Sequence, residues 1–199
     1  MCNLLVTHHF SGLSPSPFFP EGLKNYTKSP FLFASKFIPL PMQIGIISDT
    51  HNILPKSVLK HFKNVDYIFH AGDIGDLKIL DELKEIAPVY AVHGNIDNGE
   101  TRKKIPAMHC DEIEGFEICL IHDIGSVKNF SYELFKNGNK ADLVIFGHMH
   151  RPIYEIFQKT TFINPGSASY PRNQKYGTIA IVNFEGKSFS HHFIDLEDS

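Results

Sequence analysis

Polar side chains that can bind metal ions recur along this chain, each just after a short apolar run. In order they are Asp49, His51, Asp73, Asn95, His122, His148 and His150. Imidazole and carboxylate donors without thiolates suit Mn²⁺, Fe, Ni²⁺ or Zn²⁺ rather than Ca²⁺. Taken together, these donors predict a site for two metal ions.

The apolar runs predict the strands that must position the donors. They lie at residues 43–48, 66–70, 88–93, 116–121 and 142–146. Short β-branched and aromatic runs are typical of buried strands, and polar residues just past them lie at the carboxyl ends of the strands. Ligands bind at that edge in open α/β sheets. The donors are spaced by about one strand and one crossover, so we expect them to meet at one edge.

The remaining pattern completes an α/β fold. Helices are expected at residues 55–63, 77–85 and 127–136, with Pro55 in the first helical turn. Further strands are expected at residues 107–113, 153–158, 160–163, 177–184 and 188–194. Glu114-Gly115 is the expected turn of a hairpin. A parallel first half followed by an antiparallel second half predicts two packed sheets with helices outside.

Bulk composition narrows the class of protein. The chain has 199 residues, 42% of them hydrophobic, which suits one folded domain. The net charge is −3, and the scattered Lys and Arg residues argue against a dedicated nucleic-acid-binding surface. No apolar run approaches the ~20 residues that span a bilayer, so no membrane partner is expected. The three cysteines, Cys2, Cys110 and Cys119, argue by their odd number against a disulfide framework and favour a reducing cytoplasm.

Residues 1–41 differ from the rest of the chain. They hold six of the twelve prolines and a single acidic residue, Glu21, and show no periodicity. We expect them to lie outside a folded domain of residues 42–199. Three explanations stay open: a targeting leader, an accessory arm, or an extension upstream of a natural start at Met42. The apolar stretches are too short for a secretory signal, and an organellar leader would carry arginine.

Taken singly, most of the candidate motifs are weak. Asp49-x-His51, Gly72-Asp73 and Gly94-Asn95 are each also explained as turns, because Asp, Asn and Gly tolerate turn conformations. His122 alone would more often be a buried, hydrogen-bonded histidine than a ligand. Gly147-His148-Met149-His150 is stronger, since it presents two imidazoles one residue apart on a loop. The ordered series carries the prediction.

This series, with Asp97 after Gly94-Asn95, resembles the calcineurin-like metallophosphoesterase superfamily. Asn164-Pro165-Gly166-Ser167 further resembles its small single-domain bacterial and archaeal phosphodiesterase branch. The resemblance runs from about Met42 to the C-terminus and implies a four-layer αββα sandwich. It also implies that one metal is held by Asp49, His51, Asp73 and His150. The other would be held by Asp73, Asn95, His122 and His148, with Asp73 bridging. Mn²⁺ is the expected metal.

A two-metal phosphoesterase follows from such a site. The ions would lower the pKa of a shared water, and the resulting hydroxide would attack phosphorus in line. Two divalent ions less two carboxylates and one hydroxide leave roughly +1, which attracts a phosphate ester. Asp97 is expected to orient a ligand, with a solvated turn as the alternative. Asn95 and Arg172 are candidates to contact the phosphate.

Two positions depart from the family pattern. Many relatives have His where this chain has Ile96, and that His can assist the leaving group. Its loss removes general-acid help of typically 10²–10⁴-fold and favours good leaving groups or another proton donor. Relatives also commonly have Gly where Asp123 follows His122, and this carboxylate could tune His122 or crowd the second metal. His70, inside a strand pattern, is expected in the core or in support of the ligands.

The leading hypothesis is a cytoplasmic metal-dependent phosphodiesterase or phosphatase that acts on a small phosphate ester. The alternative is a catalytically silent protein-interaction scaffold, because a retromer subunit shares this sandwich fold. A scaffold need not keep its metal ligands, and here every expected ligand position is filled. A purely structural metal site is a third option, which predicts closed coordination. The strand-rich C-terminal half offers an edge for homodimerisation.

Overall fold

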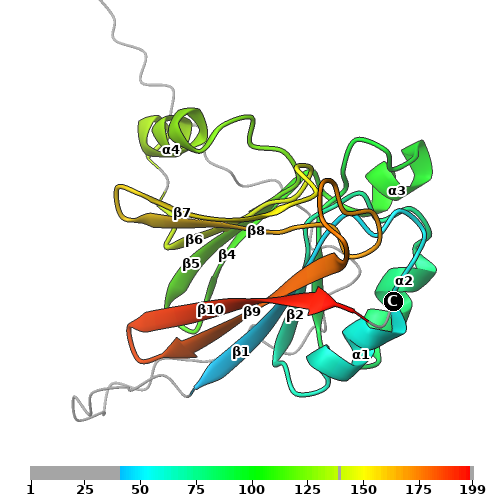
Figure 1. The fold of residues 1–199 in the computed structure, drawn as a ribbon. Helices are drawn as coiled ribbons and strands as arrows, with labels where there is room; N and C mark the ends of the chain where they lie inside the picture. Colours follow the sequence, from blue (N-terminus) through cyan, green and yellow to red (C-terminus); the bar gives the residue numbers. More distant parts are fainter. Residues whose placement is uncertain (1–40, 139, 198–199) are drawn as a thin grey trace, which may run out of the picture. The chain divides into compact units, whose positions relative to one another are not determined.

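The computed structural model describes residues 41–138 and 140–197. The expected N-terminal extension, residues 1–41, lies outside the described residues except for Pro41, so it stays a prediction. The described chain forms two five-stranded sheets with helices, an α/β fold (Figure 1). None of the helices in these described ranges is long and apolar enough to cross a membrane.

The first sheet joins the beginning and the end of the described chain. Its order is β10-β9-β1-β2-β3. Strands β1 (Met42–Ile47), β2 (Tyr67–His70) and β3 (Val89–Ala91) are parallel. Strand β9 (Gly177–Glu185) pairs with β1 in antiparallel fashion, and β10 (Ser188–Leu196) pairs with β9 in the same way. The parallel first half predicted from the sequence is thereby confirmed.

The second sheet has the order β4-β5-β6-β8-β7. Its members are β4 (Met108–Ile113), β5 (Phe116–Ile121), β6 (Leu143–Ile145), β7 (Pro152–Phe157) and β8 (Thr160–Pro165). Its outer pairs are antiparallel, but β5, β6 and β8 pair in parallel. The expectation of an antiparallel second half is wrong for these central strands. A helix connects β5 to β6 and strand β7 intervenes between β6 and β8, and such crossovers give parallel pairing.

Side chains along each central strand point alternately to its two faces, and those on the inner faces form the core between the sheets. Ile44 and Ile46 of β1 are fully buried in one cluster with Leu143 and Ile145 of β6. The residue between the two isoleucines, Gly45, faces the helical layer instead. A Cβ placed there would lie 2.7 Å from the ring of Phe62. Both faces of β1 are therefore covered, as its continuous apolar run predicts.

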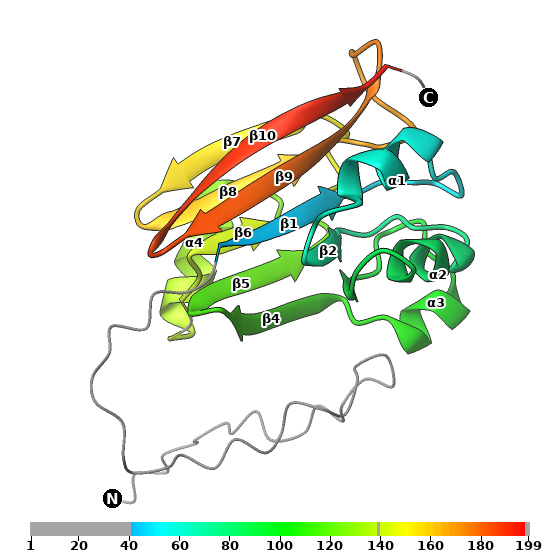
Figure 2. The same cartoon turned by 90° about the horizontal axis from the view of Figure 1, so that it is seen from below.

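Helices cover the outer faces of both sheets. They are α1 (Lys56–Phe62), α2 (Lys78–Lys84) and α4 (Val127–Lys136), while α3 (Gly99–Lys104) lies in the connection from β3 to β4. Buried residues of α1 and α2 pack with the first sheet, and Leu134 of α4 packs with the second. Figure 1 shows α4 above the second sheet, and α1 and α2 lie beside the first sheet in Figures 1 and 2. The predicted αββα sandwich is confirmed.

Helix α3 is an addition to the elements predicted from the sequence. Asn98 caps it, because the side-chain oxygen accepts hydrogen bonds from the main-chain N–H groups of Glu100 and Thr101, each 2.9 Å away. Such caps satisfy the first free N–H groups of a helix. The helix is only six residues long, too short to show an apolar period. A capped helix of fewer than two turns therefore cannot be found from periodicity.

A disulfide joins Cys110 of β4 to Cys119 of β5. The two residues are register partners in the hairpin, and their Cα atoms are 4.1 Å apart. The turn between the strands is Glu114-Gly115, as predicted, with both residues at positive φ. The argument from the cysteine count against disulfide bonding is wrong for this pair, because hairpin register and not the number of cysteines brings the two sulfurs together.

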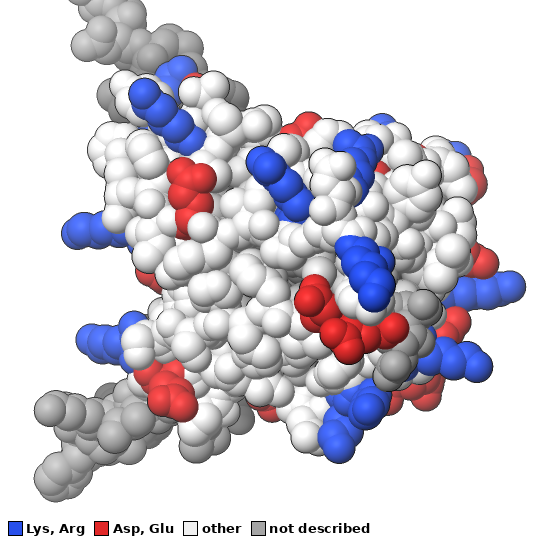
Figure 3. Space-filling model, viewed as in Figure 1, with Lys and Arg blue, Asp and Glu red and all other residues white. Residues whose placement is uncertain are grey.

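Charged side chains are mixed on the surface of the sandwich. On the face seen in Figure 3, lysines and arginines are interspersed with acidic side chains. This distribution agrees with the small net charge of −3.

Candidate metal centre

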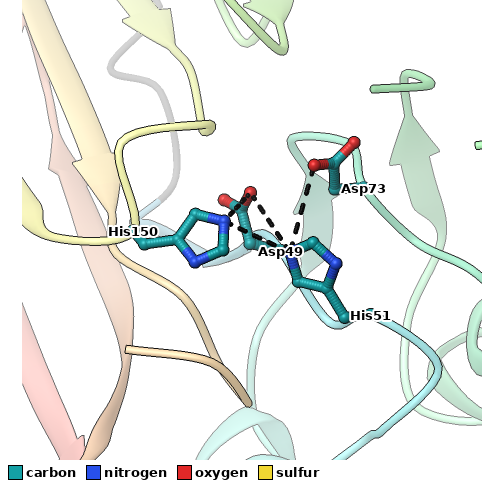
Figure 4. Close-up of side chains that lie close together, drawn as sticks. All are labelled: Asp49, His51, Asp73 and His150. Atoms are coloured by element: carbon teal, nitrogen blue, oxygen red, sulfur yellow. Dashed lines mark hydrogen bonds and ion pairs between the residues drawn. The ribbon is translucent and has the colours of Figure 1, made fainter. Parts of the chain in front are cut away.

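Four of the predicted ligands converge at the carboxyl ends of the strands. We call Asp49, His51, Asp73 and His150 the first donor group. One ligand atom from each lies within 4.8 Å of all the others (Figure 4). The Nε2 atoms of His51 and His150 are 3.2 Å apart, and His150 Nε2 lies 3.1 Å from Asp49 Oδ1. The first and last members are 101 residues apart in the sequence, and they meet here because both follow strands that end at the same edge, as predicted.

The other predicted ligands form a second donor group next to the first. It consists of Asp73, Asn95, His122 and His148. Asn95 Oδ1 lies 3.0 Å from His122 Nε2 and 3.0 Å from His148 Nδ1. Asp73 Oδ1 lies 3.4 Å from His122 Nε2. The structure therefore brings all seven predicted ligands into two adjoining groups that share Asp73.

The two oxygens of Asp73 face different donor groups. Oδ1 lies near His122, whereas Oδ2 lies 4.0 Å from His51 Nε2. Oδ1 also accepts a hydrogen bond from the main-chain N–H of Ile96 at 2.9 Å. The carboxylate thus lies between the two groups, with one oxygen toward each.

Main-chain hydrogen bonds join the loops that carry these side chains. The N–H of Asp49 donates to the carbonyl of Gly72, and the N–H of His51 donates to the carbonyl of Asp73, each at 3.0 Å. The loop after β1 is therefore fixed against the loop after β2. The N–H of His148 in turn donates to Asp49 Oδ2 at 3.1 Å. This bond attaches the loop after β6 to the loop after β1.

Most of the predicted ligands lie in the left-handed backbone region. The φ angles are 53° at Asp49, 43° at His51, 53° at Asp73, 69° at His148 and 55° at His150. Such angles cost roughly 1–3 kcal/mol at a non-glycine residue and persist where the surroundings enforce them, often at functional sites. These backbone conformations therefore lower the stability of the fold while they direct the side chains into the site.

Gly94 permits the closest backbone approach in the site. A Cβ at this position would lie 2.5 Å from the main-chain nitrogen of Asp73 and still closer to its carboxylate. Any larger residue would displace the side chain that the two donor groups share. The glycine of the Gly94-Asn95 motif is therefore a requirement of packing against Asp73.

Electrostatics keep Asp73 in its anionic form. Burial favours the neutral acid, but hydrogen bonds from His122 and from the Ile96 N–H outweigh it, so the pKa of Asp73 is lowered. The pKa of His122 is raised, because bonds to Asp73 and to the Ala71 carbonyl outweigh the opposing effect of burial. The two shifts share one physical cause, the short contact between the His122 ring and the Asp73 carboxylate.

The two histidines of the first donor group respond differently. The close contact with Asp49 raises the pKa of His150, against the effect of burial. Burial lowers the pKa of His51, although Asp73 and Asp49 partly oppose it. A neutral His51 next to an anionic carboxylate is the protonation pattern that metal binding needs.

The donor atoms fit divalent cations. Asp49 Oδ1 is buried and accepts no hydrogen bond from the described residues, although His150 Nε2 is 3.1 Å away. His150 and His122 each direct Nδ1 to a main-chain carbonyl, at 2.6 Å and 2.7 Å. When these imidazoles are neutral, Nδ1 carries the proton and the lone pair on Nε2 points into the site. Unpaired acceptors that converge on one point are what a cation satisfies.

Asp97 supports the ligand loops through the main chain. Its buried carboxylate accepts hydrogen bonds from the N–H groups of Gly75 and Gly94, at 2.9 Å and 2.7 Å. It therefore joins the loop after β2 to the loop after β3. Its predicted role of orienting a ligand stays a prediction, now with a route through the backbone.

Arg102 of α3 was not among the predicted site residues. Its guanidinium donates hydrogen bonds to the carbonyls of Gly94, Asn95 and Asp97, at 3.1, 2.8 and 2.8 Å. The side chain thus holds the loop that carries Asn95. Because α3 was missing from the sequence prediction, nothing in the sequence pointed to this arginine.

His70 lies directly beneath the ligand loops. Its Nε2 is 3.0 Å from Thr50 Oγ1, and its Nδ1 accepts a hydrogen bond from the N–H of Gly72 at 3.3 Å. Since the Thr50 hydroxyl donates to the Ile74 carbonyl, Nε2 must donate to Thr50, which assigns the tautomer. Desolvation by burial lowers the pKa of His70 to about 4. The neutral ring therefore supports the first two ligand loops.

The Asn164-Pro165-Gly166-Ser167 motif also supports these loops. The Asn164 side chain donates to the Gly147 carbonyl, and Ser167 Oγ donates to the Asp49 carbonyl at 2.7 Å. A motif recognised only by resemblance thus has a physical role, which is to fix main-chain carbonyls next to two ligand histidines and Asp49.

Two further candidates lie at the border of the site. The main-chain N–H of Arg172 donates to the His150 carbonyl at 3.3 Å, which keeps this exposed residue near the first donor group. Asp123 Oδ2 lies 3.9 Å from Nε2 of His148, which places it beside the second donor group. Whether this carboxylate tunes His122 or crowds a second metal stays a prediction.

Comparison with known proteins now bears on this geometry. The family model of the calcineurin-like phosphoesterase superfamily domain matches residues 42–187. The chain belongs to this superfamily. The resemblance seen in the sequence is thereby confirmed. Together with the Asp and His cluster, membership supports a metal-dependent phosphoesterase that uses divalent cations.

Individual relatives agree with the family. A probable metallophosphoesterase of Methanocaldococcus jannaschii is 39% identical over 139 residues, which cover 66% of this chain and 70% of that protein. A phosphodiesterase of the same organism is 29% identical over 138 residues, 63% of this chain and 83% of that protein. The structure of vacuolar protein sorting 29 from Cryptosporidium parvum has a TM-score of 0.70 at 19% identity, covering 79% of this chain and 93% of that one. The last likeness concerns the fold alone.

Proposed function

We propose that this calcineurin-like phosphoesterase is a two-metal-dependent phosphodiesterase. The observation that carries the proposal is the position of Asp73. One carboxylate oxygen lies 4.0 Å from His51 in the first donor group, and the other lies 3.4 Å from His122 in the second. A single ion would not need seven donors in two groups joined by one carboxylate, whereas paired ions are commonly bridged in this way.

Each donor group would hold one divalent ion, with Mn²⁺ as the proposed metal and Ni²⁺, Fe or Zn²⁺ as alternatives. When bound, such ions attract a phosphate ester and acidify water so that it can attack phosphorus. The residues of the chain fix the donors in place, and the neutral amide of Asn95 adds a ligand without cancelling positive charge. We further propose that Asn95 and the guanidinium of Arg172 contact the phosphate.

A small phosphodiester with a good leaving group is the proposed substrate class. One relative named above is a phosphodiesterase, which supports a diester over a monoester. Ile96 offers no proton to a leaving group, although its main-chain N–H holds Asp73. Hydrolysis should therefore depend strongly on how well the departing oxygen tolerates negative charge.

Metal-dependent hydrolysis by the full chain tests this proposal. Bis(p-nitrophenyl) phosphate and p-nitrophenyl phosphate are compared with Mn²⁺ and with EDTA. We expect diester hydrolysis that EDTA abolishes and that Asp73→Asn lowers at least about a hundredfold, because several kcal/mol of charge stabilisation would be lost. Asp81→Asn on α2 is the matched control, since it removes an exposed carboxylate and should leave the rate unchanged.

A protein-interaction scaffold is the outcome favoured by a negative result. The fold likeness to vacuolar protein sorting 29 makes this the alternative to consider. No turnover with any divalent metal, in protein shown to be folded, would overturn the enzymatic proposal. Homodimerisation and a cytoplasmic location stay predictions.

A further inference from the structure

Four exposed apolar residues lie in or beside the loops that carry the two donor groups. We call Ile53, Ile96, Met149 and Tyr170 the apolar rim. Their exposed fractions are 61%, 44%, 39% and 66%. Single exposed apolar residues are common on proteins and need no explanation. These four, however, are each tied to the ligand loops by sequence or by hydrogen bonding.

The ties are short. Met149 lies between the ligands His148 and His150, and Ile96 directly follows Asn95. Ile53 closes the turn after His51, with its N–H donating to the Thr50 carbonyl at 2.7 Å. A substrate whose phosphate reached the donor groups would have its organic part next to this rim.

Tyr170 is the best positioned member of the rim. Its ring centroid is 6.0 Å from that of His51 and 6.1 Å from that of His150. Its carbonyl accepts the 2.6 Å hydrogen bond from His150 Nδ1, and its N–H donates to Ser167 Oγ at 2.8 Å. The main chain of Tyr170 is thus part of the site, while most of its ring surface is open to solvent.

We propose that Tyr170 is a stacking platform for a planar aromatic ring in the substrate. The inference rests on the proposed phosphodiesterase function and narrows its substrate class to small phosphodiesters that carry an aryl group or a nucleobase. Aromatic faces stack on bases and other planar rings with little dependence on their substituents. The thioether of Met149 adds a polarisable contact of the kind that also favours aromatic rings.

Three substrates with the same leaving group test the inference. They are methyl p-nitrophenyl phosphate, phenyl p-nitrophenyl phosphate and the p-nitrophenyl ester of thymidine 5′-phosphate. In each, water adds to phosphorus, the P–O bond to p-nitrophenolate breaks with its electron pair, and a proton and a phosphate monoester remain. With Mn²⁺ we expect kcat/KM for both ring-bearing esters to exceed that of the methyl ester about tenfold, in the range of one stacking contact.

Variants of the tyrosine isolate the ring. Tyr170→Phe should keep the tenfold preference, whereas Tyr170→Ala and Tyr170→Leu should reduce it severalfold. The preference is a ratio within one variant, so a change common to all three substrates cancels. Tyr132→Ala removes a tyrosine of similar exposure on α4 and should keep the preference. Calorimetric titration with phenyl phosphate and methyl phosphate, in Mn²⁺, gives the same comparison as a binding ratio.

The outcomes separate the two proposals. If the methyl ester is hydrolysed as fast as the others, or if Tyr170→Ala keeps the preference, the stacking inference is wrong and the phosphodiesterase proposal stands. If none of the three esters is hydrolysed with Mn²⁺, the phosphodiesterase proposal fails and the inference fails with it. A preference that Tyr170→Leu retains would replace stacking by simple apolar contact.

Discussion

Replacing His70 by a side chain that cannot titrate should change how the protein responds to acid. His70 is fully buried under the first two ligand loops, between Thr50 and Gly72. Burial lowers its pKa to about 4 from an ordinary value of 6.5. His70→Gln offers a donor for Thr50 and an acceptor for Gly72, so it keeps the pattern of hydrogen bonds without the proton equilibrium.

The magnitude follows from the two pKa values. Below pH 6.5 the unfolded chain binds a proton at His70, while the folded protein does not until the pH approaches 4. Stability therefore falls as the pH drops through this window, and the full effect of about 2.5 pKa units is roughly 3.4 kcal/mol. Between pH 7 and pH 5 the loss is about 2 kcal/mol.

Urea unfolding of the full chain in EDTA, followed by circular dichroism at pH 7 and pH 5, measures this loss. The wild type should lose about 2 kcal/mol more than His70→Gln does, because the other titrating groups act equally on both proteins and cancel in the difference. Equal losses in the two proteins would refute the neutral, buried state assigned to His70. A larger loss of stability in His70→Gln than in the wild type would mean that folding raises the pKa of His70 and does not lower it.

Three more predictions follow from the site and its hairpin. Gly94→Ala should displace Asp73 and weaken Mn²⁺ binding about 10- to 100-fold, as measured by calorimetry. The control Gly99→Ala should not weaken binding, because its added methyl group meets nothing within 4 Å. Equal Mn²⁺ affinities of the two variants would contradict the packing argument. Reduction of the β4–β5 disulfide should lower the free energy of unfolding by about 2.5–3 kcal/mol in urea titrations, and free thiols in the unreduced protein would show that the bond is not formed. Ile96→His should raise hydrolysis of diesters with poor alkoxide leaving groups by about 10²-fold and change bis(p-nitrophenyl) phosphate little. An equal rise for both substrates would refute the idea that Ile96 leaves the site without a proton donor for the leaving group.

Much of the fold was accessible from the sequence because both sheets are covered on both faces. Each central strand is then a continuous apolar run, and polar ligands can only follow where the run ends. This logic located the ligand segments, including the Gly147-His148-Met149-His150 loop. It could not assign strands to sheets, since β9 and β10 return to the first sheet over a long sequence separation.

The details that make the site work were not accessible in this way. The left-handed backbone at Asp49, Asp73 and other predicted ligands occurs in loops that tertiary hydrogen bonds join, and the sequence pattern did not reveal it. Arg102 holds the loop of Asn95 from a capped helix that is too short to show an apolar period. His70 is indistinguishable in sequence from any histidine inside a strand, and only its buried hydrogen bonds reveal its position under the ligand loops.

The most direct test of the central claim is a crystal structure of the full chain with Mn²⁺, using anomalous scattering to locate the metal. We predict two anomalous peaks, one within each donor group, separated by about 3.5–4 Å as in other two-metal sites. The carboxylate of Asp73 should contact both ions. A single peak, or an Asp73 carboxylate bound to only one of two ions, would contradict the account.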